Sequence, residues 1–356
     1  MYKRQVGSSY DGALALGGTN GSDPQQHPLI AHYNGAVWRF VAAPKLSGAL
    51  SGIDCVSEER CVAVGGQPHG VEGSSTLIEQ FNGTSWSVVA SPNQIPPAST
   101  ALNTSTGDLI TSNWLSAVSC ANASNCLAVG GTSSLPTNER QAQDFPLSET
   151  YEGSEWQVAP VSNSWSGSLT SDSCVDSSCF SVGLVEGIPL PPQKASGQFT
   201  GLYVPHSWRR LDAPEASGTG VAGVACLSIR ECFGVGGDQE NQPYAAVLSR
   251  ESWRTVPVTP TTANASLWGL ACLHSRCVAV GSAGFHISSS SPRSRALVVT
   301  LDARRGAAQI VTLHNARNDI LLSVACPSPK RCFAVGYSQK VAPFGAARLL
   351  VVSGSP

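Results

Sequence analysis

The chain of 356 residues contains few charged residues, only 13% of the total, and its net charge is −2. Proteins that follow nucleic-acid phosphates carry a basic surface, so this balance argues against a nucleic-acid partner. The sequence has no run of about 18 apolar residues, and we therefore predict no transmembrane helix. Hydrophobic residues make up 42% of the chain, which is enough to build a folded core.

The sequence also lacks the local motifs of common catalytic and cofactor sites. It contains no H-E-x-x-H, G-x-S-x-G or P-loop pattern, and the glycine-rich phrase ALALGGTNG is not followed by a helical pattern. The histidines follow no metal-ligand spacing; they are His27, His32, His69, His206, His274, His286 and His314. We predict neither a metal nor a cofactor.

The first five residues, MYKRQ, read as a translation of the mosaic-end sequence used in transposon-based sequencing libraries. We expect residues 1–5 to be a library artefact, the alternative being an ordinary basic N-terminus. On the first interpretation, the missing signal peptide says nothing about the compartment of the protein.

One phrase of about 17 residues occurs six times, each time with two cysteines before a small apolar segment and a glycine. Its first cysteines lie 65, 54, 52, 46 and 54 residues apart. The copies are LSGIDCVSEERCVAVGG, LSAVSCANASNCLAVGG, LTSDSCVDSSCFSVGL, VAGVACLSIRECFGVGG, LWGLACLHSRCVAVGS and LLSVACPSPKRCFAVGY. A seventh, cysteine-free copy, QVGSSYDGALALGG, opens the chain. A repeat of this length is typical of propellers, solenoids and arrays.

Each repeat contains four short runs of alternating or β-branched residues, separated by Gly, Asn, Ser and Pro, and no helical periodicity of useful length. We therefore predict an all-β fold, a β-propeller of about seven four-stranded blades, with six or eight possible. The opening unit has only a weak first strand, and the last lacks a Trp-bearing fourth strand, so the two ends could close the ring in one blade. We predict a single domain, 6–356, with units at about 6–49, 50–114, 115–168, 169–220, 221–266, 267–320 and 321–356.

The first strand of each unit alternates bulky and small positions, as expected where inner strands crowd around an axis. The small positions are Gly52, Ala117, Ser171, Gly223, Gly269 and Ser323. The bulky positions are Ile53, Val118, Asp172, Val224, Leu270 and Val324. Asp172 breaks the pattern. We interpret it either as a functional residue or as the result of a local register shift, since its unit has the shorter C-x4-C spacing.

Each cysteine pair flanks the predicted turn between the first and second strands, where opposed residues lie close enough for a disulfide. We predict one disulfide in each of six hairpins: Cys55–Cys61, Cys120–Cys126, Cys174–Cys179, Cys226–Cys232, Cys272–Cys277 and Cys326–Cys332. The alternative is structural zinc, but His274 is the only histidine between paired cysteines. Disulfides require an oxidising compartment, so we predict a secreted or cell-surface protein.

These repeats resemble those of sialidase-like (BNR, Asp-box) propellers and of photosystem II assembly-factor-like propellers. Cys55 takes the place of a Phe, Ala63-Val64-Gly65 match directly, and Asn82 to Trp86 looks like a worn Asp-box turn in which Phe81 replaces the Asp. The cysteine-bearing version looks like repeats of secreted proteins from actinobacteria. The resemblance covers about residues 6–356 and implies the fold. It implies no sialidase activity, because the arginine triad of that family cannot be assembled here.

Two acids, Asp54 and Asp172, fall on the predicted inner strands. Glycoside hydrolysis requires two carboxylates about 5 to 10 Å apart, so these are our candidate catalytic residues. The alternative is that both are structural.

The tryptophans fall into two groups. Those that recur at the start of the fourth strand are predicted core residues: Trp38, Trp86, Trp156, Trp208 and Trp253. Trp114, Trp165 and Trp268 lie outside that register and could contact a ligand or pack in loops. Long loops are predicted at 91–113, 131–148, 184–198 and 282–295. Because binding residues concentrate on loops, we expect ligand contacts near Asp108, Trp114, Glu139, Arg140 and Asp144, unless these are solvated inserts.

We therefore predict a non-catalytic, secreted or cell-surface binding or scaffold propeller, monomeric, which recognises a protein or a cell-envelope glycan through long loops on one face. The alternative is a carbohydrate-active enzyme, similar to glycoside hydrolases, that uses acids near the propeller axis. An assembly-factor-like role follows from the repeat resemblance alone.

Overall fold

The computed structural model describes residues 5–8, 27–33, 36–69, 73–93, 109–136, 143–161, 166–186, 196–204, 206–212, 220–237, 242–249, 251–260, 264–273, 276–284, 294–302, 307–312, 318–328, 331–339 and 347–354. Every regular element in these residues is a β-strand, which confirms the all-β prediction. In this part of the chain we find no helix with the length and apolar character needed to cross a membrane.

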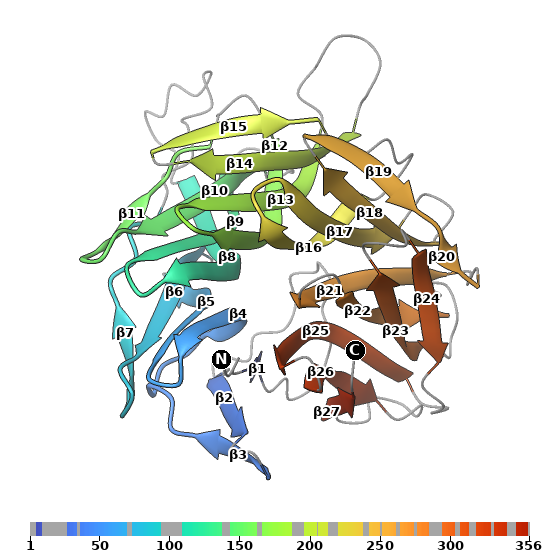
Figure 1. Ribbon diagram of the computed structural model, residues 1–356. Coiled ribbons are helices and arrows are strands. Elements are labelled where there is room, and N and C mark those ends of the chain that lie inside the picture. Colours follow the sequence, from blue (N-terminus) through green and yellow to red (C-terminus); the bar gives the residue numbers. More distant parts are fainter. Residues whose placement is uncertain are drawn as a thin grey trace. The chain divides into compact units, whose positions relative to one another are not determined.

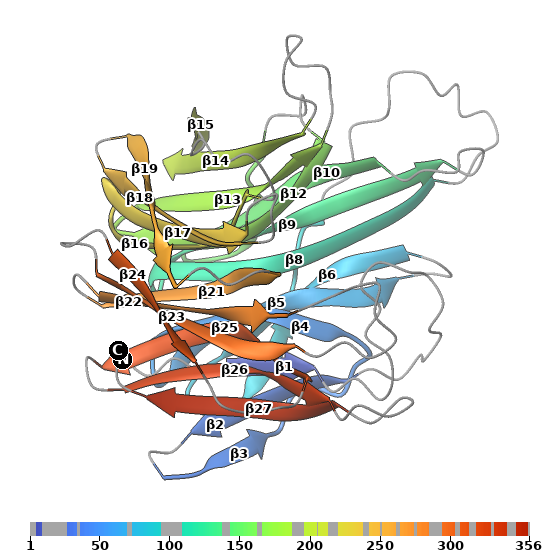
Figure 2. The same ribbon diagram turned by 90° about the vertical axis from the view of Figure 1, so that its right-hand side faces the viewer.

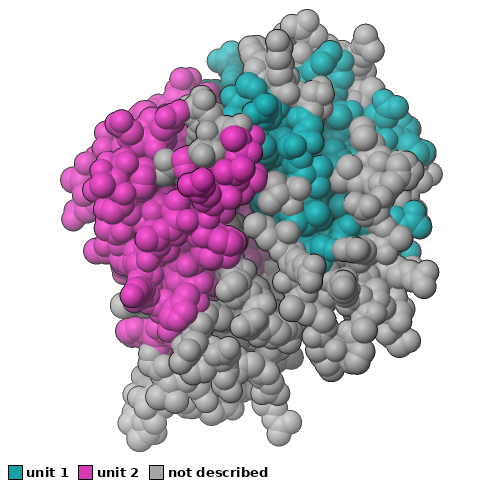
Figure 3. Space-filling model, turned by 90° about the horizontal axis from the view of Figure 1, so that it is seen from below, with its two compact units in different colours: residues 1, 9–24, 212–356 teal, residues 2–8, 25–211 magenta. Residues whose placement is uncertain are grey.

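The chain divides into two compact units, 2–8 with 25–211 and 9–24 with 212–356, Met1 grouping with the second (Figure 3). In the first unit the described strands are β1 Gln5–Ser8, β2 Pro28–Tyr33, β3 Trp38–Val41, β4 Ala49–Ser57, β5 Arg60–His69, β6 Gly73–Phe81, β7 Trp86–Val89, β8 Leu109–Asn122, β9 Asn125–Pro136, β10 Gln143–Tyr151, β11 Trp156–Val158, β12 Ser166–Val175, β13 Ser178–Glu186, β14 Ser196–Val204 and β15 Ser207–Leu211. The predicted division into sequence units stays a prediction.

The second unit has the same local organisation. Its described strands are β16 Gly220–Ser228, β17 Glu231–Gly237, β18 Pro243–Ser249, β19 Ser252–Val256, β20 Val258–Thr259, β21 Ala265–Leu273, β22 Arg276–Ala283, β23 Arg295–Asp302, β24 Ala307–Thr312, β25 Asn318–Ser328, β26 Arg331–Gln339 and β27 Ala347–Gly354.

Successive strands pair antiparallel with their neighbours in chain order (Figure 1). Four-stranded sets form from β4–β7, β8–β11, β12–β15, β16–β19 and β21–β24, the last with β20 added in parallel. The sets β4–β7 and β8–β11 are joined at one edge by a single parallel pair, Ser74 of β6 with Ser112 of β8. The sets β1–β3 and β25–β27 have three strands each. Over the described residues there are thus about seven such sets, as the predicted β-propeller requires. Within the first unit, β4–β6 and β8–β10 lie as neighbouring layers (Figure 2).

The first strands of neighbouring sets pack against one another, β8 between β4 and β12, and β21 between β16 and β25. This contact explains the small residues predicted at these positions. A Cβ added to Gly52 would lie 2.9 Å from the Cα of Ala117, and one added to Gly269 would lie 2.8 Å from the Cα of Ser323. Real Cβ atoms essentially never approach so closely, so a larger side chain would force the strands apart.

The glycine of the recurring A-V-G segment has a separate cause, a β-bulge in the preceding strand. Between Leu50 and Gly52 the register of β4 against β5 shifts by one residue, and all six cysteine-bearing sets share this shift. The bulge directs the Ala49 carbonyl at Gly65, where a Cβ would lie only 1.9 Å from the oxygen. The corresponding glycines, each with a carbonyl oxygen 1.8–2.3 Å from the added Cβ, are Gly130, Gly183, Gly236, Gly281 and Gly336.

The structure contradicts the register shift proposed for Asp172. This residue faces Ser181 across the hairpin, just as Ile53 faces Ala63 and Val118 faces Ala128. The shorter C-x4-C spacing changes the strand pairing only at the turn between the two cysteines. Sets with C-x5-C have a second irregularity after the first cysteine, as between Cys55 and Ser57, whereas β12–β13 has none there.

All six predicted disulfides are present, with Cα–Cα distances of 3.9–4.0 Å. Each joins the first and second strands of its set. Because the sulfur atoms are bonded to one another, they cannot serve as the zinc ligands of the alternative interpretation.

The core lies between consecutive sheets, and two of the five predicted fourth-strand tryptophans are fully part of it, whereas Trp38, Trp208 and Trp253 are only partly buried. Trp86 and Trp156 are 7% and 6% exposed, and each ring lies about 5.4–5.5 Å from the aromatic ring opposite it on the third strand, Phe81 and Tyr151 respectively. In the turn before Trp86, the side-chain Oδ1 of Asn82 accepts hydrogen bonds from the backbone N–H groups of Thr84 and Ser85, both at 3.0 Å.

Candidate functional site

A cavity of about 340 Å³ lies between the sheets β4–β7 and β8–β11, at the disulfide-bearing end of their strands. Its lining residues are Asp54, Val56, Ser57, Glu59, Arg60, Cys61, Val62, Gln80, Phe81, Asn82, Ser87, Cys120, Asn122, Ala123, Cys126 and Tyr151. In an antiparallel propeller sheet this end carries the turns between strands one and two and between strands three and four. The long connections predicted to bind ligand leave from the opposite end.

The strand register explains how the two walls arise. Asp54, Val62, Gln80 and Ser87 are paired in one row across β4, β5, β6 and β7. The facing wall is the row Cys120, Cys126 and Tyr151, across β8, β9 and β10. One wall therefore offers a carboxylate, an amide and a hydroxyl, and the other a disulfide and an aromatic ring.

Two asparagines at the mouth of the cavity are held by their own turns. The Oδ1 atom of Asn82 is occupied as described above, and Oδ1 of Asn122 accepts a hydrogen bond from the Ser124 N–H at 2.9 Å. Because each Oδ1 atom accepts backbone hydrogen bonds, the Nδ2 group of each side chain points away from the turn and can donate to another partner. Glu59, Arg60 and Ser57 complete the exposed edge.

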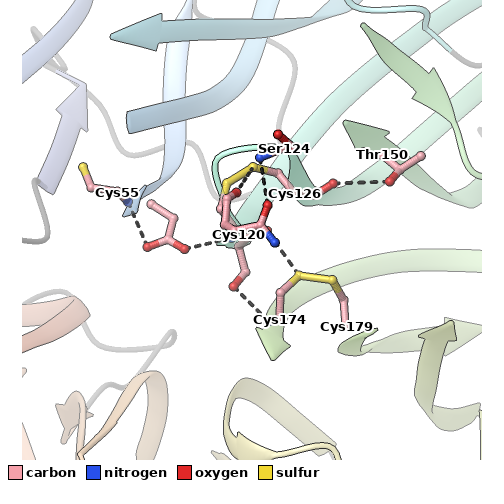
Figure 4. The surroundings of a disulfide bond; sticks show 10 residues. Cys55, Cys120, Ser124, Cys126, Thr150, Cys174 and Cys179 are labelled. Atoms are coloured by element: carbon pink, nitrogen blue, oxygen red, sulfur yellow. Dashed lines mark hydrogen bonds between the residues drawn. A yellow bond between two sulfur atoms is a disulfide. The ribbon is translucent and has the colours of Figure 1, made fainter. Parts of the chain in front are cut away.

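Asp54, a predicted catalytic residue, lines the cavity, and its carboxylate connects the two sheets. It lies between Cys55 and Cys120, which are labelled in Figure 4. Its Oδ1 accepts a hydrogen bond from the Cys55 N–H and its Oδ2 one from the Cys120 N–H, both at 2.9 Å. In the next set, Ser119 Oγ accepts one from the Cys174 N–H at the same distance. This repetition indicates that the position holds adjacent first strands together.

Asp172, the other predicted catalytic acid, is 8% exposed on β12 and is not among the residues that line the cavity. The cavity therefore does not bring the two candidate acids together.

Two predicted ligand residues lie on strands, where loops were expected. Trp114 is in β8, and its ring covers Gly131, where an added Cβ would lie 2.4 Å from Cζ2 of the ring. Asp144 is in β10, and its carbonyl accepts a hydrogen bond from Ser166 Oγ. Strands β9 and β10 occupy most of 131–148, so that predicted loop is wrong. Trp268 also lies on a strand, β21.

The remaining ligand candidates, Asp108, Glu139 and Arg140, and also Trp165, lie outside the described residues.

Sequence reasoning missed two buried acids, Glu79 on β6 and Glu149 on β10, both 0% exposed. Burial raises the pKa of each carboxyl to about 7. Among the described residues, neither carboxylate oxygen of Glu79 has a hydrogen-bond partner. The sequence does indicate their burial, because each Glu lies two residues after a buried leucine on the same face of its strand, Leu77 and Leu147 respectively.

Glu149 joins the end of one sheet to the next. Its Oε2 accepts a hydrogen bond from Ser91 Oγ at 2.7 Å, and Ser91 in turn contacts the Thr76 hydroxyl. Asn93 Oδ1 accepts from the Thr76 N–H at 2.8 Å. The segment that follows β7 is thus fixed between β6 and β10.

No protein-family model and no curated protein matches the chain. Solved structures do. They include Ycf48 bound to a D1 peptide, at 13% identity over 70% of this chain and 72% of that one, with a TM-score of 0.40. A fucose-specific lectin from Aleuria aurantia is 8% identical over 86% and 96% of the two chains, with a TM-score of 0.46. A sialidase from Trypanosoma rangeli is 9% identical over 89% of this chain and 56% of that one, with a TM-score of 0.48.

Proposed function

We propose that this protein is an extracellular, non-catalytic binding protein whose ligand is a protein or a cell-envelope glycan. The observation that carries the proposal is the cavity between β4–β7 and β8–β11, which has a polar wall and an apolar wall. Ligand sites commonly combine a largely apolar concave surface with a few positioned polar groups.

The six disulfides support the extracellular part of this proposal. Every cysteine of the chain is bonded in a pair. Disulfides persist in oxidising environments and are rare in the cytosol.

The hydrogen bonds of Asp54 support binding rather than hydrolysis. A glycosidase needs one carboxyl to give a proton and a second to act as nucleophile or base. Asp54 accepts two backbone hydrogen bonds that connect β4 to β8, and Asp172 does not line the cavity.

The test is retention of the oxidised protein on insoluble cell-envelope glycans (chitin, cellulose, peptidoglycan) and on an immobilised extracellular protein fraction. We expect saturable retention on one of these materials without release of reducing ends. Absence of retention on all of them would overturn the binding proposal. Release of reducing ends that Asp172→Asn abolishes would instead establish the carbohydrate-active enzyme.

The same assay separates the cavity from the predicted long-loop surface. Trp114→Ala alters the described part of that surface, and Gln80→Leu alters the cavity wall. We expect Gln80→Leu to reduce retention and Trp114→Ala to leave it unchanged. The reverse result would assign binding to the long loops.

A further inference from the structure

We propose that the cavity between β4–β7 and β8–β11 is a binding site for a small, neutral saccharide. This inference rests on the proposed function and names the ligand class and the residues that recognise it.

The row that forms the polar wall differs in composition from sheet to sheet. The position of Val62 on the second strand is held by Phe180 in β13 and Phe233 in β17, whose side chains are 1% and 0% exposed. The position of Gln80 is held there by Leu202 and Val247, both buried. Where those sheets fill the row with large apolar side chains, β4–β7 has the smaller Val62 and the polar Gln80. The same two positions hold Leu127 and Thr150 in β9–β10, Val278 and Thr300 in β22–β23, and Phe333 and Ser353 in β26–β27. Among these described sheets, β4–β7 is thus distinguished by the long amide side chain of Gln80 beside a small Val62.

The groups that face the cavity suit sugar hydroxyls, which both donate and accept hydrogen bonds. Asn82 and Asn122 present Nδ2 donors held by their turns. Gln80 offers a donor and an acceptor, and the Ser87 hydroxyl can act as either. Tyr151 and Val62, 8% and 6% exposed, provide the apolar surface against which the C–H face of a sugar ring can pack.

The charges at the site favour a neutral ligand. Glu59 and Arg60 are adjacent, exposed and opposite in sign. The carboxylate of Asp54 accepts two backbone N–H groups and connects β4 to β8. The mouth therefore presents no concentration of one charge that would select an anion or a cation. A volume of about 340 Å³ lies near the lower end of the roughly 300–1,000 Å³ found for ligand pockets, which indicates a short saccharide.

The experiment is titration of the oxidised protein with defined sugars, followed by calorimetry and by saturation-transfer NMR. The neutral probes are glucose, galactose, mannose, N-acetylglucosamine, cellobiose and diacetylchitobiose. Glucuronate and glycylglycine are the charged comparison probes. We expect saturable binding of at least one neutral sugar and tighter binding than of either charged probe.

Two kinds of variant place the binding in the cavity. Val62→Phe fills the space with the side chain that β13 and β17 carry at this position. Asn82→Asp with Asn122→Asp keeps the oxygens that accept the turn hydrogen bonds and removes the Nδ2 donors. Both are expected to weaken sugar binding at least tenfold. Gln80→Leu, which introduces the side chain found at Leu202, gives a third test if Val62→Phe fails to fold.

The controls introduce the same Phe side chain, or a negative charge, away from the cavity. Val278→Phe places the same side chain at the corresponding position of β22 in the other unit. Ser154→Asp adds a negative charge to the exposed β10–β11 turn, which does not line the cavity. Both should bind sugar as the unaltered protein does.

The inference is overturned if no neutral sugar binds, if only the charged probes bind, or if Val62→Phe and the Asn variants bind normally. If retention on an envelope glycan or protein persists in these variants, the cavity assignment fails while the binding function stands. If nothing is retained and no sugar binds, both fail.

Discussion

At the scale of single residues, this protein is constrained by close approaches of backbone to backbone. The bulge in each first strand directs a carbonyl at the glycine of the A-V-G segment, so that position has no room for a side chain. At Asp54 and Ser119 a side chain is required instead of excluded. Each accepts a hydrogen bond from the backbone N–H of a cysteine in the next set. Residues that look interchangeable in the repeat are thus fixed by their neighbours across a sheet or between sheets.

The adjacent glycines Gly65 and Gly66 give a matched test of the bulge. A Cβ at Gly65 would lie 1.9 Å from the Ala49 oxygen, whereas at Gly66 the nearest atoms are 3.7 Å away. We expect Gly65→Ala to lower the free energy of unfolding by about 3 kcal/mol. Gly66→Ala should change it by less than about 1 kcal/mol. Urea denaturation measures both, and equal effects would contradict the bulge explanation.

A second prediction concerns Asp54 as a connection between first strands. Asp54→Ala leaves the N–H groups of Cys55 and Cys120 without their side-chain acceptor. We expect a loss of about 3 kcal/mol in unfolding free energy, because an unsatisfied buried donor carries its full desolvation penalty. Asp54→Ser should recover part of it, since Ser119 performs this role in the next set. If Asp54→Ala has unaltered thermal and urea stability, the connecting role is wrong.

At the scale of elements, six sheets have a disulfide between their first and second strands. In the first unit, aromatic pairs such as Phe81 with Trp86 also pack the third strand against the fourth. The disulfide fixes which residues of the first and second strands oppose one another. This register then carries across the sheet and sets the row Asp54, Val62, Gln80 and Ser87 that forms one wall of the cavity. The bond therefore contributes to the site as well as to stability.

Removing one bond tests this element-scale argument. We expect Cys120→Ala with Cys126→Ala to lower the free energy of unfolding by about 2 kcal/mol, since the closed loop is short. The effect should add to that of the same change at Cys272 and Cys277, because that pair lies in another sheet of the other unit. Urea midpoints of the two double variants and of the combined variant measure this. An unchanged midpoint in either would contradict the prediction.

At the scale of the whole molecule, the two buried glutamates make stability depend on pH. Their pKa in the folded protein is raised to about 7 from the ordinary value of 4.5, so the folded state holds more protons than the unfolded state between these values. Stability therefore falls as the pH rises through this window. Each Glu contributes up to about 3 kcal/mol to the difference.

We expect the protein to be more resistant to urea at pH 5 than at pH 8. Glu79→Gln combined with Glu149→Gln removes both ionisations and should reduce that difference, whereas Glu231→Gln, at an exposed position, should leave it unchanged. Urea midpoints at the two pH values are the measurement. A combined variant with the full pH dependence would show that other groups cause it.

The fold could be predicted from the sequence because each repeat contains the residues that determine its own strands and turns. The cysteine spacing predicts a hairpin disulfide within a few residues, and strand alternation predicts the small position at Gly52. Sequence reasoning did not reach the cavity, since that depends on which rows of β4–β7 and β8–β11 face one another. It also placed Trp114 and Asp144 in loops, because the extension of β8 and β10 comes from strand pairing that the local pattern does not contain.

The sequence by itself determined the all-β repeat, the six disulfides and the tryptophan-bearing outer strands, because each depends on contacts within one unit. Only the tertiary structure decided that Asp54 reaches the Cys120 N–H, 66 residues further along the chain, and that Ser91 reaches Glu149. It likewise decided that Val62 lines a cavity, whereas β13 and β17 place the buried Phe180 and Phe233 at this position. These features arise between sheets, where side chains meet partners that are distant in the chain and set by packing.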